Sequence, residues 1–186
     1  MNRRGICARC LLAAVTLLGI TARQNLRAQT PKPSEYEVEA AYLSNFGRFV
    51  EWPARAGAAN EAFNVCVLGP DPFGSLLDAA LKGETIGNTP MAARRVSGPE
   101  DAAGCRILFI SSAKESQVNA VLKALGNANI LTVSDMADFT RRGGMIEFVL
   151  QGNRVRFEIN LAATQRAGLA LSSELLRVAV AVRRGP

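Results

Sequence analysis

The sequence contains no histidine, and this absence excludes several familiar kinds of chemistry. Histidine is the most frequent general base in enzymes and a common zinc ligand, and it belongs to every Ser-His-Asp and Cys-His catalytic arrangement. The length of 186 residues, of which 48% are hydrophobic, fits one globular domain. We therefore predict a single domain that is not an enzyme and that uses neither a metal ion nor another cofactor.

The chain also lacks an excess of charge outside its N-terminal region. Five of its 22 lysine and arginine residues fall within the first 28 positions, which contain no aspartate or glutamate. The remaining 17 basic side chains are balanced by 16 acidic ones, so this part has no basic stripe of the kind that a nucleic-acid groove needs. We expect no nucleic-acid partner.

Residues 1–28 have the pattern of a secretory signal peptide. Several arginines precede an apolar stretch from Leu11 to Ala22, which is too short to span a bilayer, since a spanning helix needs about 20 residues. No later segment has 18 consecutive apolar residues. We expect cleavage after Ala28, which leaves residues 29–186 as one exported domain without direct membrane insertion.

Only two of the four cysteines lie outside this leader. Cys7 and Cys10 form a C-x-x-C pattern within the segment that we expect to be removed. Cys66 and Cys105 each lie in an apolar, strand-like run, so one disulfide between neighbouring strands is the simplest outcome in an oxidising compartment. Two buried free thiols are the alternative.

The first element of the exported domain is predicted to be a helix that begins at Ser34 and ends before Pro53. Ser34 and Glu37 have the spacing of a capping box, in which each residue satisfies a backbone donor of the other. Aromatic residues recur along this segment at helical spacing, and we interpret them as core residues rather than as a groove for a partner. The stripe consists of Tyr42, Phe46 and Phe49.

Strand and helix patterns alternate in the middle of the chain. The predicted strands are 63–68, 84–86, 91–96, 106–110 and 130–133, and the predicted helices are 75–82, 115–125 and 135–142. This order favours a mostly parallel sheet flanked by helices, which is a three-layer α/β fold.

The C-terminal third predicts a β-hairpin followed by a closing helix over 172–182. Residues 145–150 and 154–161 form the two strands, and the second alternates apolar and polar side chains. Its polar face consists of Arg154, Arg156, Glu158 and Asn160. That face is either a solvated surface with cross-strand ion pairs or a recognition surface.

Two short motifs resemble functional signatures but lack essential parts. The loop 69–75 joins a strand to a helix, yet it has no lysine of the phosphate-binding type, and Pro70 and Pro72 remove two backbone donors. Ser111 and Lys114 form a Ser-x-x-Lys motif without its partner motifs. We interpret both segments as turns that start helices.

Several segments together resemble the YfiR/HmsC-like family of bacterial periplasmic proteins. The similarity covers about residues 35–182, and its parts occur in the order found in the family. These parts are 36–53, 66–69, 71–74, 107–111, 131–135, 143–146, 156–160 and 167–176.

The resemblance implies a periplasmic regulator, often dimeric, that represses a diguanylate cyclase in the inner membrane. Cyclic di-GMP and biofilm formation would then stay low. In the family Cys66 and Cys105 correspond to a disulfide, whereas the second, C-terminal disulfide of some members is absent because no cysteine follows Cys105. As contacts to the partner or to a ligand we select Trp52, Glu158 and Asn160. A periplasmic ligand-binding or accessory module for another membrane sensor, such as a histidine kinase, is the alternative.

Overall fold

Helix α1 (Glu35–Phe49) begins at the predicted capping box. In this computed structural model, the Glu37 backbone N–H donates to the Ser34 hydroxyl at 3.2 Å, and the Ser34 backbone N–H donates to the Glu37 carboxylate at 2.6 Å. The structure describes residues 33–53 and 62–185, so the predicted signal peptide lies outside the described residues. Within those ranges, no helix is both long and apolar enough to cross a bilayer.

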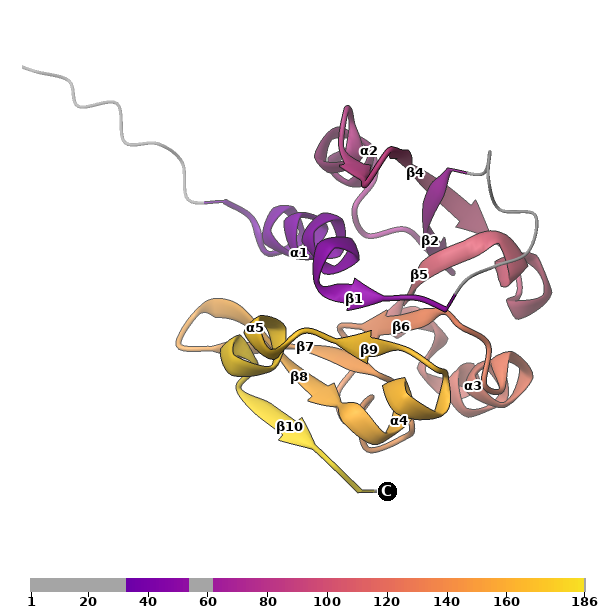
Figure 1. Cartoon of the computed structure of the whole chain (residues 1–186), viewed down its shortest axis with the longest axis vertical. Helices are drawn as coiled ribbons and strands as arrows, with labels where there is room; N and C mark the ends of the chain where they lie inside the picture. The colour runs from indigo at the N-terminus through magenta and orange to yellow at the C-terminus, as the bar shows by residue number, and fades with distance from the viewer. Residues whose placement is uncertain (1–32, 54–61, 186) are drawn as a thin grey trace, which may run out of the picture. The chain divides into compact units, whose positions relative to one another are not determined.

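The centre of the domain is a sheet of mostly parallel strands (Figure 1). Its strands are β2 (Phe63–Leu68), β3 (Thr85–Ile86), β4 (Thr89–Val96), β5 (Cys105–Ile110), β6 (Leu131–Ser134), β7 (Ile146–Gln151), β8 (Arg154–Asn160) and β10 (Ala181–Arg183). The order across the sheet is β10-β8-β7-β6-β5-β2-β4-β3. Strands β4, β2, β5, β6 and β7 run parallel, and β8 returns antiparallel to β7 as the predicted hairpin.

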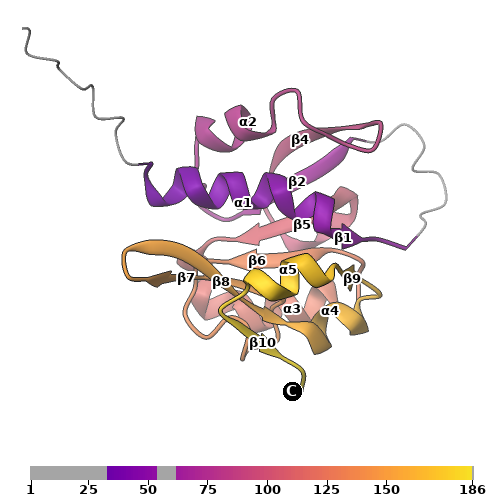
Figure 2. The same ribbon diagram turned by 60° about the vertical axis from the view of Figure 1, so that its left-hand side comes forward.

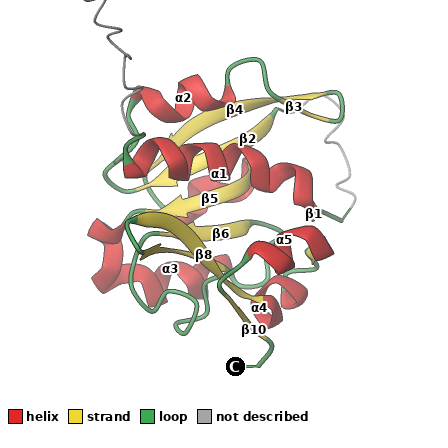
Figure 3. Cartoon of the chain, turned by 90° about the vertical axis from the view of Figure 1, so that its left-hand side faces the viewer, coloured by secondary structure: helices red, strands yellow, loops and turns green. Residues whose placement is uncertain are grey.

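Helices cover both faces of this sheet, which confirms the predicted three-layer α/β fold (Figures 2 and 3). The remaining elements are β1 (Val50–Glu51), α2 (Ser75–Leu81), η2 (Pro99–Gly104), η3 (Ser112–Gln117), α3 (Val118–Leu125), α4 (Leu161–Arg166), β9 (Ala170–Leu171) and α5 (Ser173–Val178). Buried residues of α1, α2 and α5 share one apolar cluster, whereas buried residues of α3 belong to the cluster on the opposite face. The predicted helix over 115–125 begins as the 3₁₀ helix η3 and continues as α3.

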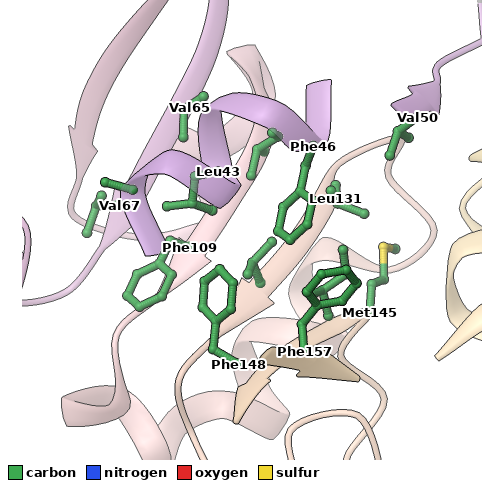
Figure 4. Close-up of a cluster of buried hydrophobic side chains, with 14 of the residues drawn as sticks. Leu43, Phe46, Val50, Val65, Val67, Phe109, Leu131, Met145, Phe148 and Phe157 are labelled. Carbon is green, nitrogen blue, oxygen red and sulfur yellow. The ribbon is translucent and has the colours of Figure 1, made fainter. Parts of the chain in front are cut away.

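Aromatic packing fixes α1 on the β7–β8 hairpin, as Figure 4 shows for Phe46, Phe148 and Phe157. The Phe46 ring centroid lies 5.3 Å from that of Phe157 and 6.0 Å from that of Phe148. Tyr42 adds a second edge-on contact to Phe157 at 5.3 Å. Such pairs contribute about 0.5–1.5 kcal/mol each beyond the burial of their apolar area. The prediction that the aromatic stripe belongs to the core is therefore confirmed.

Residues 135–142 form turns, so the predicted helix in this segment is wrong. The buried Glu147 carboxylate on β7 accepts hydrogen bonds from the backbone N–H groups of Asp138 and Thr140 and from the Thr140 hydroxyl, each at 3.0 Å. Asp138 also has a φ of 59°, a left-handed conformation that a helix does not contain. Glu147 thus takes the backbone donors that a helix would satisfy internally.

The C-terminal segment also departs from the prediction of a helix over 172–182. Helix α5 ends at Val178, and the Val180 N–H donates to the Phe157 carbonyl at 2.9 Å, which leads the chain into β10 along the edge of β8. The predicted strand ending at Leu161 is one residue too long, because Leu161 is the first residue of the unpredicted helix α4.

Cys66 on β2 and Cys105 on β5 form a disulfide with their Cα atoms 5.9 Å apart. The two strands are neighbours in the sheet, and both cysteines are fully buried beneath α3. The bridge therefore links two central strands through the interior of the domain.

Replacing both cysteines, Cys66→Ala with Cys105→Ala, should lower the free energy of unfolding by about 3–4 kcal/mol, because the unfolded chain is no longer constrained by the loop closure. Urea denaturation of the mature domain measures this difference. Wild-type protein unfolded with a thiol reductant is the matched control and should reach a similar midpoint. A double variant as stable as the oxidised wild type would contradict the prediction.

Candidate functional site

Trp52 lies in the wall of a pocket of about 270 Å³, beyond the end of α1. The side chain of this residue, the first of the selected contacts, is half-buried. Its ring meets the Phe63 ring edge-on, with centroids 5.1 Å apart. The described residues that line this pocket, called the Trp52 pocket below, are Val50, Trp52, Ala62, Phe63, Ile86, Thr89, Gly104 and Arg106.

Local features of the backbone shape this pocket at the amino ends of β2, β4 and β5. The pairing of β2 with β5 shifts between Asn64 and Val65, so Arg106 is an extra residue in the register. Such a bulge redirects a side chain, and Arg106 lines the pocket. On the helix side, a Cβ on Gly47 would lie 2.7 Å from the Ile86 side chain, so glycine permits this close approach of β3 to α1.

Glu158, the second selected contact, lies half-buried on β8 and faces the edge strand β10. Its carboxylate accepts a hydrogen bond from Arg183 at 3.4 Å, and the same guanidinium also donates to the Thr140 hydroxyl at 3.3 Å. A partly exposed ion pair of this type stabilises a fold by about 0–1 kcal/mol. Glu158 is therefore accessible to a partner without being essential to the fold.

Asn160 has a structural position, which corrects the expectation that it belongs to an exposed polar face. The residue is only 5% exposed. Its side-chain oxygen accepts from the Ala163 N–H at 3.0 Å and caps α4, while its amide nitrogen donates to the Thr140 carbonyl at 2.8 Å. The strand ends at this residue, so the alternation of faces ends there as well.

The structure does not bring the three selected residues into one site. Trp52 packs on Phe63 of β2, whereas Glu158 and Asn160 lie on β8. Three strands separate β2 from β8 in the sheet. The candidate partner contact on β8 and the Trp52 pocket are therefore separate places on the fold.

A cluster of acidic groups at the carboxyl ends of β5 and β6 was not selected from the sequence. Glu39 of α1 is only 1% exposed, and its Oε2 atom has no hydrogen-bond partner among the described residues. Burial, with a smaller contribution from Asp135 and then Glu35, raises the pKa of Glu39 to about 8. Burial also raises the pKa of Asp135, whose carboxylate accepts hydrogen bonds from the Ser112 backbone and hydroxyl. Glu39 is therefore a neutral carboxylic acid at neutral pH.

Helical periodicity could have identified Glu39, because it precedes Leu43 and Phe46 by four and seven residues and so shares their buried face. Just beyond the carboxyl end of β2, Gly69 packs against the Lys114 side chain. The Lys114 side chain lies so close to Gly69 that a Cβ there would be 2.9 Å from Lys114 Cγ. Among the described residues, no group of three or more acidic or cysteine side chains is arranged to hold a metal ion.

The structure thus defines a disulfide-linked three-layer α/β domain with a pocket at the amino ends of its central strands. The model of the YfiR/HmsC-like family (DUF4154) matches residues 36–180, and the chain belongs to this family. Members of the family are known as periplasmic regulators of diguanylate cyclases.

A crystal structure of a conserved domain protein from Vibrio cholerae O1 biovar El Tor has a similar fold. The two chains superpose with a TM-score of 0.55 and are 10% identical in sequence. The match covers 81% of this chain and 60% of the Vibrio protein, so it extends over only part of that protein. The likeness supports the fold alone.

Replacing Asn160 with alanine should lower the free energy of unfolding by about 1–3 kcal/mol, because α4 loses its cap and the Thr140 carbonyl loses a buried donor. Glu158→Ala on the same strand should change it by less than about 1 kcal/mol. Chemical denaturation of both variants measures the contrast. Equal stabilities for the two variants would argue against the structural role of Asn160.

Glu39→Gln should reduce the loss of stability as the pH rises. Below about pH 4.5 the carboxyl group is protonated in both the folded and the unfolded state. Between pH 4.5 and about pH 8 only the folded state keeps the proton, so wild-type stability falls by up to ~1.4 kcal/mol per pH unit. Glutamine does not ionise, so the variant should be more stable than wild type at pH 7 to 8.

Thermal unfolding temperatures measured from pH 4 to pH 8.5 test this prediction. Asp135 remains in the variant, so some pH dependence should persist. Glu51→Gln removes an exposed carboxylate from the neighbouring strand β1 and should leave the wild-type profile unchanged. Parallel pH profiles for wild type and Glu39→Gln would show that Glu39 is not protonated in the folded state.

Proposed function

We propose that this protein is exported to the periplasm and represses a membrane-bound diguanylate cyclase by binding the cyclase's periplasmic domain. The observation that carries the proposal is the family match over residues 36–180. The buried disulfide supports it, because such bridges persist in oxidising compartments. Repression would lower cyclic di-GMP and restrain biofilm formation.

Binding without turnover is sufficient for this role. A regulator that binds the inactive arrangement of a sensor more tightly than the active one shifts the equilibrium between them. A shift from mostly active to mostly inactive needs about 3–5 kcal/mol of such preference. A few well-packed anchor residues supply this amount. The regulator acts as a monomer or as the homodimer common in the family.

Exposed apolar side chains near the hairpin provide candidate anchors. Leu150 on β7 is 59% exposed, and Val178 at the end of α5 is 53% exposed. The Arg156 guanidinium donates to the Val178 carbonyl at 3.3 Å. Leu150 pairs with Val155, which is the residue before Arg156 on β8. Both apolar side chains therefore lie beside one stretch of β8. Leu150 shares the apolar face of β8 with Val155, whereas Arg156 and Glu158 belong to the opposite, polar face. We name Leu150 and Val178 the hairpin surface and assign the partner contact to it, with Glu158 on the opposite face as a separate candidate.

Deleting the gene in the source bacterium should raise intracellular cyclic di-GMP, and wild-type protein should restore the low level. Leu150→Asp and Val178→Asp should each fail to restore it, because a charge replaces an apolar anchor. Asn127→Asp, which adds the same charge at an exposed position after α3, should restore it fully. The test measures intracellular cyclic di-GMP together with the amount of each variant in the periplasm.

The same experiment also tests the disulfide. The double cysteine variant should restore repression poorly because less folded regulator is present. An unchanged cyclic di-GMP level on deletion would contradict the cyclase as target. It would favour the alternative role, an accessory module for another membrane sensor such as a histidine kinase.

A further inference from the structure

Positive and negative charges nearly balance over residues 29–186, but they are separated along the chain. Residues 141–186 contain eight arginines, no lysine and three acidic residues. Two of the three acidic side chains are committed within the fold, since Glu147 is buried and accepts three hydrogen bonds and Glu158 is paired with Arg183. The C-terminal third therefore has a surplus of positive charge at its surface.

Two of these arginines share the polar face near the turn of the β7–β8 hairpin. Arg154 and Arg156 are separated by one residue on β8, so their side chains lie on the same face and their Cα atoms are about 7 Å apart. Arg154 is exposed and Arg156 is half-buried. Within the described chain the Arg156 guanidinium donates to the Val178 carbonyl, and neither arginine takes part in an ion pair. Both charges are therefore available to an anionic partner.

The residues outside the described ranges do not change this balance. Residues 1–32 contain no acidic residue, and 54–61 contain one, Glu61. Glu61 is two residues before the start of β2, and β7 runs in the same direction as β2, so the hairpin turn lies at the opposite end of the sheet from the start of β2. The surplus of positive charge at the hairpin turn therefore does not depend on those segments.

The end of the hairpin projects beyond the neighbouring strands (Figures 1 and 2). β7 pairs with β6 only through Ile146 and Glu147, and β10 pairs with β8 only from Glu158 onward. The rest of the hairpin, up to the turn at Gly152 and Asn153, is thus a two-stranded ribbon that can meet a surface outside the domain.

The polar face of this ribbon is open rather than hollowed. The cross-strand neighbours of Arg154 and Arg156 are Gln151 and Val149, which add neither an acidic group nor an aromatic wall. Other exposed arginines lie on α4, on α5 and after β10, so positive charge extends over several elements instead of filling one groove. They are Arg166, Arg177 and Arg184. A broad field of this kind matches an extended anionic surface better than a short acidic peptide.

We infer that the end of the β7–β8 hairpin binds the surface of an anionic lipid bilayer, with Arg154 and Arg156 on the phosphates of the headgroups. Arginine suits this contact because its planar guanidinium donates two parallel hydrogen bonds to a phosphate. The contact is peripheral and needs no insertion into the bilayer. Leu150 lies on the opposite face of the ribbon, so the inference does not depend on the proposed function.

Cosedimentation of the mature protein with large unilamellar vesicles tests the inference. Vesicles of three parts phosphatidylcholine to one part phosphatidylglycerol should bind at least about tenfold more tightly than vesicles of phosphatidylcholine alone, and added salt should weaken the binding. Arg154→Gln combined with Arg156→Gln should lower the affinity for the anionic vesicles at least about tenfold.

The matched control removes the same net charge elsewhere on the domain. Lys82 follows α2 and Lys123 lies on α3, and both are exposed. Lys82→Gln combined with Lys123→Gln should bind the anionic vesicles nearly as wild type does, because charges far from the contact are screened.

A second variant keeps the test decisive if the double arginine variant does not fold, as judged from circular dichroism. Arg154→Glu reverses one exposed charge, leaves the bond of Arg156 in place and should weaken vesicle binding as strongly. The inference would be overturned by equal binding to both kinds of vesicle, by wild-type binding of a folded arginine variant, or by an equal loss in the lysine control. Binding to a poly-glutamate peptide but not to anionic vesicles would also overturn it and would identify an acidic protein segment as the partner of these arginines.

Discussion

The packing of α1 on the β7–β8 hairpin is the contact on which the rest of the structure depends. It joins a helix near the start of the described chain to strands near its end, through the rings of Tyr42, Phe46, Phe148 and Phe157. Because these rings interlock, the helix has a defined position along the sheet. Its end at Phe49 allows β1 to pair with β9 and places Trp52 over the amino end of β2.

Close packing of this kind forces each polar side chain beneath it to be satisfied or neutral. Glu147 accepts three hydrogen bonds and organises the turns after β6, and Asn160 uses both ends of its amide to cap α4 and hold Thr140. The Glu39 Oε2 atom has no hydrogen-bond partner in the described part of the chain, and Asp135 lies nearby, so keeping the proton avoids the cost of a buried charge. Burial thus decides which of the polar residues that look functional in the sequence have a structural role and which remain exposed.

A three-layer α/β fold does not define a function, since this architecture supports many unrelated activities. Family membership therefore carries the functional assignment, and the structure contributes the surfaces on which it can act. The hairpin surface and the Trp52 pocket are separated by the intervening strands of the sheet. Of the elements between them, α1 contacts β8 directly and approaches the pocket residue Ile86 through Gly47.

The sequence alone determined the features that depend on local pattern. The capping box at Ser34, the aromatic face of α1, the alternating strands and the hairpin all follow from spacing along one segment, and the apolar runs around Cys66 and Cys105 indicated neighbouring strands. Family segments in the right order added the regulatory assignment, which no single residue carried.

Tertiary contacts decided the features in which distant residues compete for the same backbone groups or for burial. Glu147 converts the expected helix over 135–142 into turns, and Phe157 draws the chain after Val178 into an edge strand. Asn160 leaves the polar face because α4 begins there, and Trp52 becomes part of a pocket because its ring packs on Phe63 of β2. These outcomes rest on partners far apart along the chain, which a local pattern cannot specify.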